Sequence, residues 1–291
     1  MKILIIGGGG MLGHKLVQTL NDRCDVWTTI RGDFHNYEKY KIFERRRTIF
    51  DLDVSDTKLL EREVEKIKPD VIINAVGIIK QIKDSNDVIK TLNVNSIFPH
   101  KLADIAEKYD SRLICISTDC VFNGEKGNYT EEEPPDAYDL YGKSKNLGEV
   151  VGENCLTLRT SIIGRELQTS NSLVEWFLSN KDKKVRGFAN AIFSGFPTVF
   201  MAEILYDLIV NFKKLSGLYH VSSEPINKFD LLKLIKEAYN IDIEIERFED
   251  FKIDRSLNST KFRKETGFNP PDWKKLLEMM ANDPTHYDIW K

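Results

Sequence analysis

Short apolar runs alternate with longer segments of helical spacing through the first half of the chain, and this alternation limits the folds open to it. Runs of strand type occur at residues 3–6, 25–30, 48–52, 70–74, 112–117 and 155–159. Between most of them lie segments, such as 56–68 and 95–109, whose apolar residues recur with a helical period. Continuous apolar runs of this kind indicate a parallel sheet with helices on both faces, so we predict a doubly wound α/β fold.

The second half of the chain is less regular. Helices are expected there at residues 171–180, 199–213, 228–239 and 272–282. At 291 residues the chain can bury a large core, as one large domain or two interlocked ones. Because no repeat or low-complexity linker separates the halves, we expect them to pack as one unit.

The composition excludes several classes of protein. A net charge of −3 and a pI near 6.0 give no sign of the basic surface that binds nucleic acid. The first apolar run is too short for a signal peptide, and nothing approaches the roughly 18 apolar residues of a membrane span. The four cysteines form no CxxC pair and no disulfide-like spacing, which fits a reducing compartment. We predict a cytoplasmic protein with no membrane or nucleic-acid partner and no metal site.

The sequence GGGGMLG, residues 7–13, directly follows the first apolar run. Its glycines permit a tight turn, a close approach to a pyrophosphate, and a following helix whose N–H groups face that anion. A glycine-rich turn alone is a weak signal, but here it lies between a strand and a helix at the start of an α/β unit. We predict a Rossmann-type dinucleotide site that includes Gly7, Gly10, Met11, Leu12 and Gly13.

The residue after the second strand bears on the choice of dinucleotide. An acid there would bind the adenosine ribose and favour NAD, but Arg31 and Gly32 occupy this place. A guanidinium can instead pair with a 2′-phosphate, so we predict NADPH, with NADH as the alternative. A solvated surface arginine is the plainer interpretation of Arg31. Asp53 and Val54 follow the third strand, where the carboxylate could accept a hydrogen bond from the adenine amino group.

Two later stretches, STDCVF at 117–122 and YGKSK further on, are predicted to form one active site. Thr118 ends the fifth strand, and ligands bind at the carboxyl ends of strands in open α/β sheets. Tyr141 and Lys145 are four residues apart in a segment, 136–151, that is expected to be helical, so both project from one face. A phenol has an ordinary pKa near 10, and a neighbouring ammonium would lower that pKa towards a usable acid or base.

These motifs together resemble the extended short-chain dehydrogenase/reductases. The order of the glycine turn, DVSD, NAVG at 74–77, STDCVF and YGKSK is typical of that family. More narrowly, the chain is similar to the dTDP-4-dehydrorhamnose reductase group in STDCVFNG, in EEEPPDAYDLYGKSKNLGE, in LRTS at 158–161, in GLYHVSS at 217–223 and in the closing stretch 254–273. The likeness spans nearly the whole chain.

The resemblance implies two lobes and a reaction. Residues 1–160 would form a Rossmann-type NAD(P)-binding domain, completed by part of 196–222, and residues 161–291 would mainly form a smaller C-terminal α/β lobe for a nucleotide-sugar substrate. Hydride would pass from the nicotinamide to the C4 ketone of a 4-keto-6-deoxy nucleotide sugar, for surface polysaccharide synthesis. A homodimer is compatible with this resemblance.

By the same resemblance each candidate residue receives a role. Tyr141 is the general acid, Thr118 orients the carbonyl, and Lys145 tunes the phenol and bonds the nicotinamide ribose. Further cofactor contacts are expected from Ala75, Val76, Gly77 and Asn95, and substrate contacts from Asp119, Cys120 and Val121.

Cys120 departs from the reductase pattern, which has tyrosine after Thr-Asp. Related dehydratases have glutamate there, and GDP-fucose synthases have a cysteine that moves protons beside the carbonyl; a small wall residue is the plainer interpretation. Leu173 stands where that cysteine's histidine partner would be expected, so we predict reduction without epimerisation. Two alternatives stay open. An NAD-dependent epimerase or dehydratase is disfavoured by Arg31 and the missing glutamate, and a non-catalytic regulatory subunit by the intact catalytic set.

Overall fold

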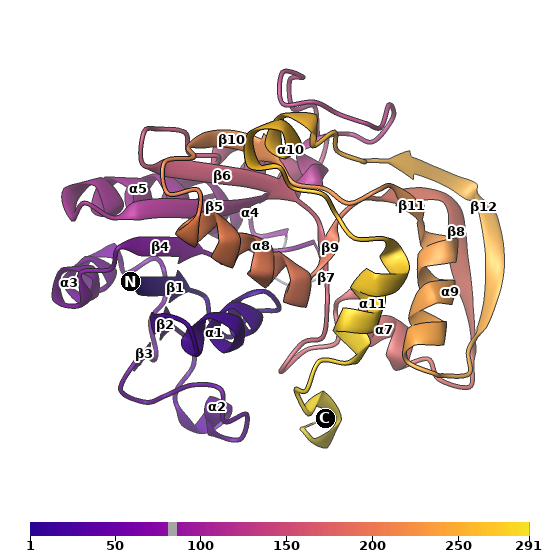
Figure 1. Ribbon diagram of the computed structural model, residues 1–291, viewed down its shortest axis with the longest axis horizontal. Coiled ribbons are helices and arrows are strands. Elements are labelled where there is room, and N and C mark those ends of the chain that lie inside the picture. Colours follow the sequence, from indigo (N-terminus) through magenta and orange to yellow (C-terminus); the bar gives the residue numbers. More distant parts are fainter. Residues whose placement is uncertain (81–85, 291) are drawn as a thin grey trace.

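The computed structural model describes residues 1–80 and 86–290, and a seven-stranded parallel sheet forms its centre (Figure 1). The strand order is β10-β6-β5-β4-β1-β2-β3, so the chain winds outward from β1 in both directions. The strands are β1 (Lys2–Ile6), β2 (Asp25–Thr29), β3 (Thr48–Ile49), β4 (Val71–Asn74), β5 (Arg112–Thr118), β6 (Cys155–Thr160) and β10 (Gly217–His220). This arrangement confirms the predicted doubly wound α/β fold.

Helices cover both faces of this sheet. On one face α1 (Gly13–Asn21) and α8 (Thr198–Val210) contribute to the larger apolar core, and on the other α3 (Thr57–Ile67) and α5 (Phe98–Lys108) form a second core. Because both faces are covered, the central strands are apolar throughout, as in the four fully buried residues Ile3–Ile6. The other helical segments of this half are α2 (His35–Glu38), α4 (Val88–Leu92), the π-helical turn η2 (Asn93–Ile97), the 3₁₀ turn η3 (Asp119–Val121) and α6 (Leu140–Leu147).

A second, three-stranded sheet forms much of the C-terminal lobe. In it β8 (Lys184–Phe193) lies between β11 (Ile226–Asn227) and β12 (Glu244–Asp254). β8 largely alternates buried and more exposed residues, as a strand covered on one face does. The remaining elements are β7 (Ile162–Ile163), which pairs with β9 (Phe196–Pro197), and α7 (Leu173–Leu178), α9 (Lys228–Ala238), α10 (Thr260–Thr266), α11 (Trp273–Ala281) and the 3₁₀ turn η4 (Tyr287–Ile289).

The structure differs from the expected elements in three places. The helix expected over 95–109 is preceded by the π turn η2. The helix expected over 136–151 is confined to α6, because Asp139 caps its start by accepting a hydrogen bond from the Gly142 N–H at 2.9 Å. The α/β character of the C-terminal lobe was expected, but the positions of its strands were not predicted, since they lack the long apolar runs of the first half.

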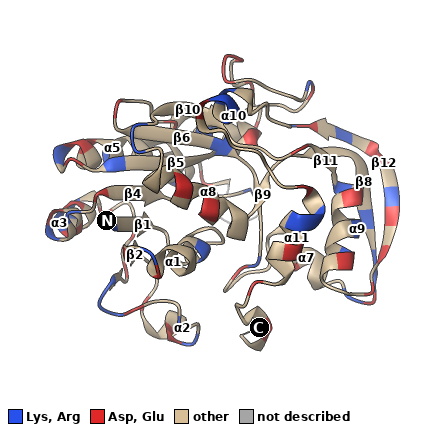
Figure 2. Ribbon diagram, in the orientation of Figure 1, with Lys and Arg blue, Asp and Glu red and all other residues tan. Residues whose placement is uncertain are grey.

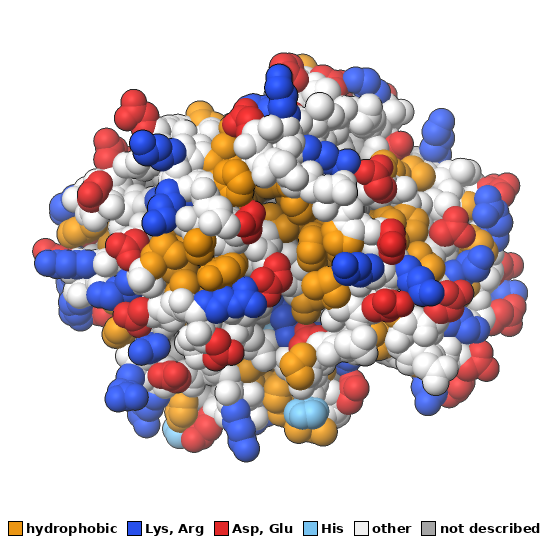
Figure 3. Space-filling model, viewed as in Figure 1, with side chains coloured by type: hydrophobic (Ala, Val, Ile, Leu, Met, Phe, Trp, Pro, Cys, Tyr) orange, Lys and Arg blue, Asp and Glu red, His pale blue; other side chains and the backbone are white. Residues whose placement is uncertain are grey.

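Charged side chains of both signs are spread over the elements of both lobes (Figure 2). On the face that Figure 3 shows, the two signs are interspersed and form no large patch of one sign. Within the described residues no helix is both long and apolar enough to cross a membrane. In the same part of the chain, no three His, Cys, Asp or Glu side chains gather as metal ligands, and the four cysteines are free thiols.

Candidate active site

The glycine turn at 7–13 joins β1 to α1 and leaves no room for side chains at its two ends. Gly7 has a φ of +91°, in the left-handed region, and a Cβ there would lie 2.6 Å from Cγ2 of Val76. A Cβ on Gly13 would lie 2.0 Å from the Gly7 carbonyl oxygen, so the first turn of α1 packs directly on the end of β1. Glycine is therefore required at both positions.

The N-terminus of α1 is open to an anion. No side chain caps this helix, and the N–H groups of Met11 and Leu12 have no acceptor among residues 1–80 and 86–290. Gly10 is exposed, and a Cβ there would meet only the Gly7 carbonyl oxygen, at 3.4 Å. Uncapped N–H groups at a helix start, beside an approachable glycine backbone, suit a pyrophosphate. The residues of this turn therefore fit the dinucleotide predicted from the sequence.

Arg31 and Asp53 lie near one another beyond the ends of β2 and β3. The carboxylate of Asp53 accepts hydrogen bonds from the N–H of Ser55 at 2.9 Å and from its hydroxyl at 2.7 Å. These bonds lower the pKa of Asp53, and the charge of Arg31 adds to the effect. Arg31 itself is exposed and has no hydrogen bond or ion pair with the described residues, so its guanidinium is available to an external anion. The side chain of Val54 is half-buried.

Asn95 holds the loop that follows β4, residues 75–78. Its Oδ1 accepts a hydrogen bond from the Ile78 N–H at 2.8 Å, and its Nδ2 donates to the Ile78 carbonyl at 3.0 Å and to the Ser144 hydroxyl at 3.1 Å. This buried amide therefore joins the loop to α6 and uses its donors on protein groups. Within the loop Ala75 and Val76 are half-buried and Gly77 is exposed.

The structure brings Thr118 and Tyr141 together. Thr118 ends β5 and begins η3, where its hydroxyl oxygen accepts a hydrogen bond from the Cys120 N–H at 3.1 Å. α6 packs directly on this turn, since a Cβ on Gly142 would lie 2.2 Å from the Cys120 carbonyl oxygen. Tyr141 precedes Gly142 and is thereby held beside Thr118, whose side chain acts on the phenol.

The surroundings of Tyr141 keep its phenol protonated. Burial, followed by the Cys120 thiol, raises the pKa of Tyr141, and the interaction with Thr118 lowers it only in part. Lys80 Nζ lies 5.6 Å from the centre of the ring, but it is paired with Asp139 at 2.7 Å. Because the pKa lies above its ordinary value, the phenol carries its proton at neutral pH, as a donor to a carbonyl oxygen must.

Lys145 is bonded to β5 and not to the phenol. Its buried ammonium donates a hydrogen bond to the Ile116 carbonyl at 2.7 Å. Burial lowers the pKa of Lys145, and Cys115 and Glu149 oppose this shift. The ammonium lies close to the loop after β4, since a Cβ on Gly77 would be 4.0 Å from Nζ. The expected lowering of the Tyr141 pKa by Lys145 is thus absent, and burial determines that pKa.

The three expected substrate residues have different surroundings. Asp119 is buried and accepts a hydrogen bond from the Thr118 hydroxyl at 3.1 Å, and burial raises its pKa. Burial, and then the charge of Asp119, raises the pKa of the Cys120 thiol to about 12. Val121 is fully buried in an apolar cluster with Phe122, so protein atoms cover the side chain that was expected to contact substrate.

Three cations that the sequence did not reveal approach this turn from other segments. The charges of Lys80 and Arg255 oppose the rise in the pKa of Cys120. Lys228, at the start of α9, interacts with the carboxylate of Asp119. These cations lie far from η3 in sequence and belong to no local motif, so only the fold reveals them.

The comparison of sequences places the chain in a known group. The RmlD substrate binding domain family matches residues 1–285. The chain belongs to this family. Membership confirms the predicted resemblance to the dTDP-4-dehydrorhamnose reductase group, and the protein is an NAD(P)-dependent oxidoreductase of the extended short-chain dehydrogenase/reductase type.

Similar proteins align with most of this RmlD-family chain. A dTDP-4-dehydrorhamnose reductase of Aggregatibacter actinomycetemcomitans is 26% identical over 305 residues, covering 95% of this chain and 97% of that protein. The spore coat polysaccharide biosynthesis protein SpsK of Bacillus subtilis is also 26% identical, with 95% of each chain covered. The methionine adenosyltransferase 2 subunit beta of Mus musculus is 26% identical over 82% of this chain and 72% of its own.

Solved structures share the fold. The crystal structure of a hypothetical dTDP-4-dehydrorhamnose reductase from Sulfolobus tokodaii aligns with a TM-score of 0.78 at 29% identity, over 94% of this chain and 98% of that one. The dTDP-4-dehydrorhamnose reductase of Bacillus anthracis strain Ames, in complex with NADP, aligns with a TM-score of 0.80 at 21% identity, over 96% of this chain and 98% of that one.

Two motifs that carried the resemblance, LRTS and GLYHVSS, form a buried network behind this RmlD-family site. The Arg159 guanidinium donates to both carboxylate oxygens of Glu149, at 2.8 and 2.7 Å, and to Nε2 of His220 at 3.2 Å. Since arginine only donates, Nε2 accepts and Nδ1 of His220 donates to the Tyr129 carbonyl at 2.9 Å. Burial and then Arg159 lower the pKa of His220 to about 4. Glu149 also accepts a hydrogen bond from Ser117, next to Thr118, at 2.6 Å, so the network holds the end of β5.

Replacement of Glu149 with alanine should destabilise the protein strongly. The substitution leaves the Arg159 guanidinium, whose side chain is 3% exposed, without its carboxylate. Loss of one partner of a buried ion pair typically costs about 3–5 kcal/mol of unfolding free energy. Urea unfolding at neutral pH measures the loss of unfolding free energy. Glu153→Ala, at an exposed position, is the control. A loss under about 1 kcal/mol, no larger than that of an ordinary surface change, would contradict the expectation.

Proposed function

We propose that this RmlD-family protein is an NADPH-dependent reductase of the C4 ketone in a 4-keto-6-deoxy nucleotide sugar, in the synthesis of surface polysaccharide. Both dTDP-4-dehydrorhamnose-like and UDP-N-acetyl-4-keto-6-deoxyhexosamine substrates fit this proposal. The observation that carries it is the protonated phenol of Tyr141 beside Thr118, at the carboxyl end of β5. The open N-terminus of α1 and the unpaired Arg31 support the dinucleotide and its 2′-phosphate.

In the proposed reaction the protein binds and orients the ketone and supplies a proton. Bound NADPH would supply the hydride. The Thr118 hydroxyl orients the carbonyl oxygen, and Tyr141 donates its proton to that oxygen as negative charge develops there. Lys145, bonded to Ile116 and close to the loop after β4, holds its ammonium where the nicotinamide ribose would bind. Asp119 and Cys120 form part of the wall beside the sugar.

The proposal includes a division into lobes and an assembly. Residues 1–160, with part of 196–222, bind the dinucleotide, and residues 161–291 mainly bind the sugar nucleotide; the pairing of β10 with β6 supports the return of the chain to the first lobe. A homodimer remains a prediction. Exposed apolar side chains on η2, on α6 and just after α6 support it, namely Ile97, Leu147 and Val151.

The alternatives predict different chemistry. An epimerase or dehydratase of this fold needs a group that removes a carbon-bound proton, and the pKa of Cys120 near 12 argues against the thiol in that role. A purely regulatory subunit would need none of Thr118, Tyr141 and Lys145, whereas all three are present in this chain.

Tyr141→Phe should reduce turnover by roughly 10²–10⁴-fold, because it removes the proposed acid and leaves the ring in place. The affinity for NADPH should change little. Turnover is measured with a panel of 4-keto nucleotide sugars, and Tyr109→Phe, which removes a phenol at the end of α5, is the control. Turnover of the Tyr141 variant within a few-fold of wild type would rule out the assigned role.

The wild-type protein should bind NADPH roughly tenfold or more tightly than NADH, since a charge-assisted hydrogen bond contributes about 1.5–3 kcal/mol. Arg31→Ala should narrow this difference by weakening NADPH binding alone. Calorimetric titration measures both affinities, and Arg46→Ala, at another exposed arginine, serves as the control. Equal affinities of the wild-type protein for the two cofactors would make Arg31 an ordinary surface residue.

Reduction should proceed without proton exchange at the carbons beside the ketone. Of the five histidines, His14 and His220 are buried in hydrogen-bond networks, and His35, His100 and His286 are exposed. None of them is bonded to Cys120, and Leu173 is the first residue of α7. The reaction in deuterated water with unlabelled NADPH should yield a sugar without carbon-bound deuterium at C3 or C5, by NMR and mass spectrometry. Enrichment there beyond an enzyme-free control would make Cys120 catalytic.

A further inference from the structure

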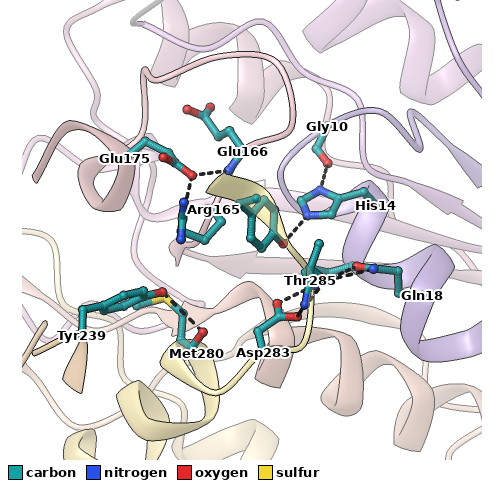
Figure 4. A network of polar contacts seen from close by, with 12 residues as sticks. Gly10, His14, Gln18, Arg165, Glu166, Glu175, Tyr239, Met280, Asp283 and Thr285 are labelled. Atoms are coloured by element: carbon teal, nitrogen blue, oxygen red, sulfur yellow. Dashed lines mark hydrogen bonds and ion pairs between the residues drawn. The ribbon is translucent and has the colours of Figure 1, made fainter. Parts of the chain in front are cut away.

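Residues 283–290, the last that the structure describes, lie against the first helix of the Rossmann-type domain, and we call them the C-terminal strap (Figure 4). The ammonium of Lys15 on α1 donates to the Thr285 hydroxyl at 2.7 Å and forms an ion pair with Asp283. Gln18, one turn further along α1, donates to the same hydroxyl at 3.0 Å. Lys15 is only 4% exposed, so these contacts form a buried interface.

One chain of hydrogen bonds leads from the strap to the glycine turn. The Tyr287 hydroxyl lies 2.7 Å from Nε2 of His14, and Nδ1 of the same ring lies 2.8 Å from the Gly10 carbonyl oxygen. A carbonyl oxygen only accepts, so Nδ1 carries the hydrogen, and Nε2 accepts from the Tyr287 hydroxyl. His14 is fully buried, and burial lowers its pKa to about 3, which keeps the ring in this neutral form.

The Gly10 carbonyl belongs to the same planar peptide as the N–H of Met11. The oxygen accepts two hydrogen bonds, from the His14 backbone N–H at 3.1 Å and from the His14 ring, and together these bonds also fix the direction of that N–H. The Met11 N–H has no acceptor among residues 1–80 and 86–290, and it lies at the uncapped start of α1. This is the place at which the pyrophosphate of the dinucleotide is expected.

We propose that Tyr287, through His14, is a positioning residue for the pyrophosphate of the bound dinucleotide. The proposal rests on the proposed function, because it requires a dinucleotide at the glycine turn. The strap has other anchors: the ion pair of Lys15 with Asp283, the bond of Arg165 to Asp288 at 2.5 Å and the edge contact of Tyr40 with Trp290. Loss of the Tyr287 hydroxyl therefore leaves the strap in place and removes only the restraint on His14.

Tyr287→Phe tests the proposal. The variant should bind NADPH and NADH about three- to tenfold more weakly, by the same factor, because the pyrophosphate is common to both cofactors. At saturating cofactor, kcat should change less than twofold, so the effect appears in KM. Calorimetric titration and steady-state kinetics measure these quantities. Tyr239→Phe, which removes the bond to the Met280 carbonyl in the same region, is the control and should leave both affinities unchanged.

A conservative change at His14 separates positioning from a structural role. The side-chain amide of asparagine in His14→Asn can still donate to the Gly10 carbonyl but cannot reach Tyr287, so this variant should retain most of the cofactor affinity. In that background Tyr287→Phe should cause no further loss, since the two residues act in series.

Two results would overturn the positioning role of Tyr287, and a third would overturn the proposed function. Unchanged affinity of Tyr287→Phe for both cofactors would overturn the positioning role, as would an equal loss from Tyr287→Phe in the His14→Asn background. Failure of the wild-type protein to bind either NADPH or NADH would instead overturn the proposed function.

Discussion

Parallel pairing of the central strands is the constraint on which the candidate site depends. In a parallel sheet the carboxyl ends of all strands meet at one edge. Ile6 of β1 pairs with Asn74 of β4, and Thr118 of β5 pairs with Thr160 of β6. The glycine turn, the loop after β4 and the turn η3 therefore leave the sheet together, although they are far apart in sequence. Since a shift of one residue would turn each side chain to the opposite face, this register also directs the Thr118 hydroxyl into the site.

A buried ion pair, Arg159 with Glu149, holds the strands near this edge of the sheet. The removal of Arg159 and Glu149 from water costs desolvation energy that their attraction offsets only with good geometry and further hydrogen bonds. Here the pair is bidentate, and His220 and Ser117 use the remaining lone pairs and donors. Such a network adds little to net stability by itself. Its effect is to permit one arrangement of β5, β6 and β10, because any other would leave a charge unpaired in the core.

Local chemistry made the parallel sheet predictable from the sequence, together with the glycine turn after β1 and the packing of Tyr141 beside Thr118. Continuous apolar runs, a glycine turn that tolerates no Cβ and the four-residue spacing of Tyr141 and Lys145 each depend on neighbours in sequence. The C-terminal sheet was missed because β12 is mostly exposed and mixed in polarity. Lys228 and Arg255 were missed because they act only through tertiary packing. The pKa of Tyr141 was misjudged for the same reason: sequence spacing reveals a nearby lysine but not burial, which is the larger effect.

Burial acts on Tyr141 and Cys120 in the same direction, with opposite consequences for chemistry. It raises the pKa of both groups, so each remains neutral at neutral pH. A neutral phenol is the form that can give a proton to a developing alkoxide, whereas a neutral thiol cannot take a proton from carbon. The Cys120 thiol also raises the pKa of Tyr141, since two neighbouring anions would repel. For the proposed reduction, the same desolvated turn therefore favours an acid at the ketone oxygen and suppresses a base beside it, which is the combination that simple reduction requires.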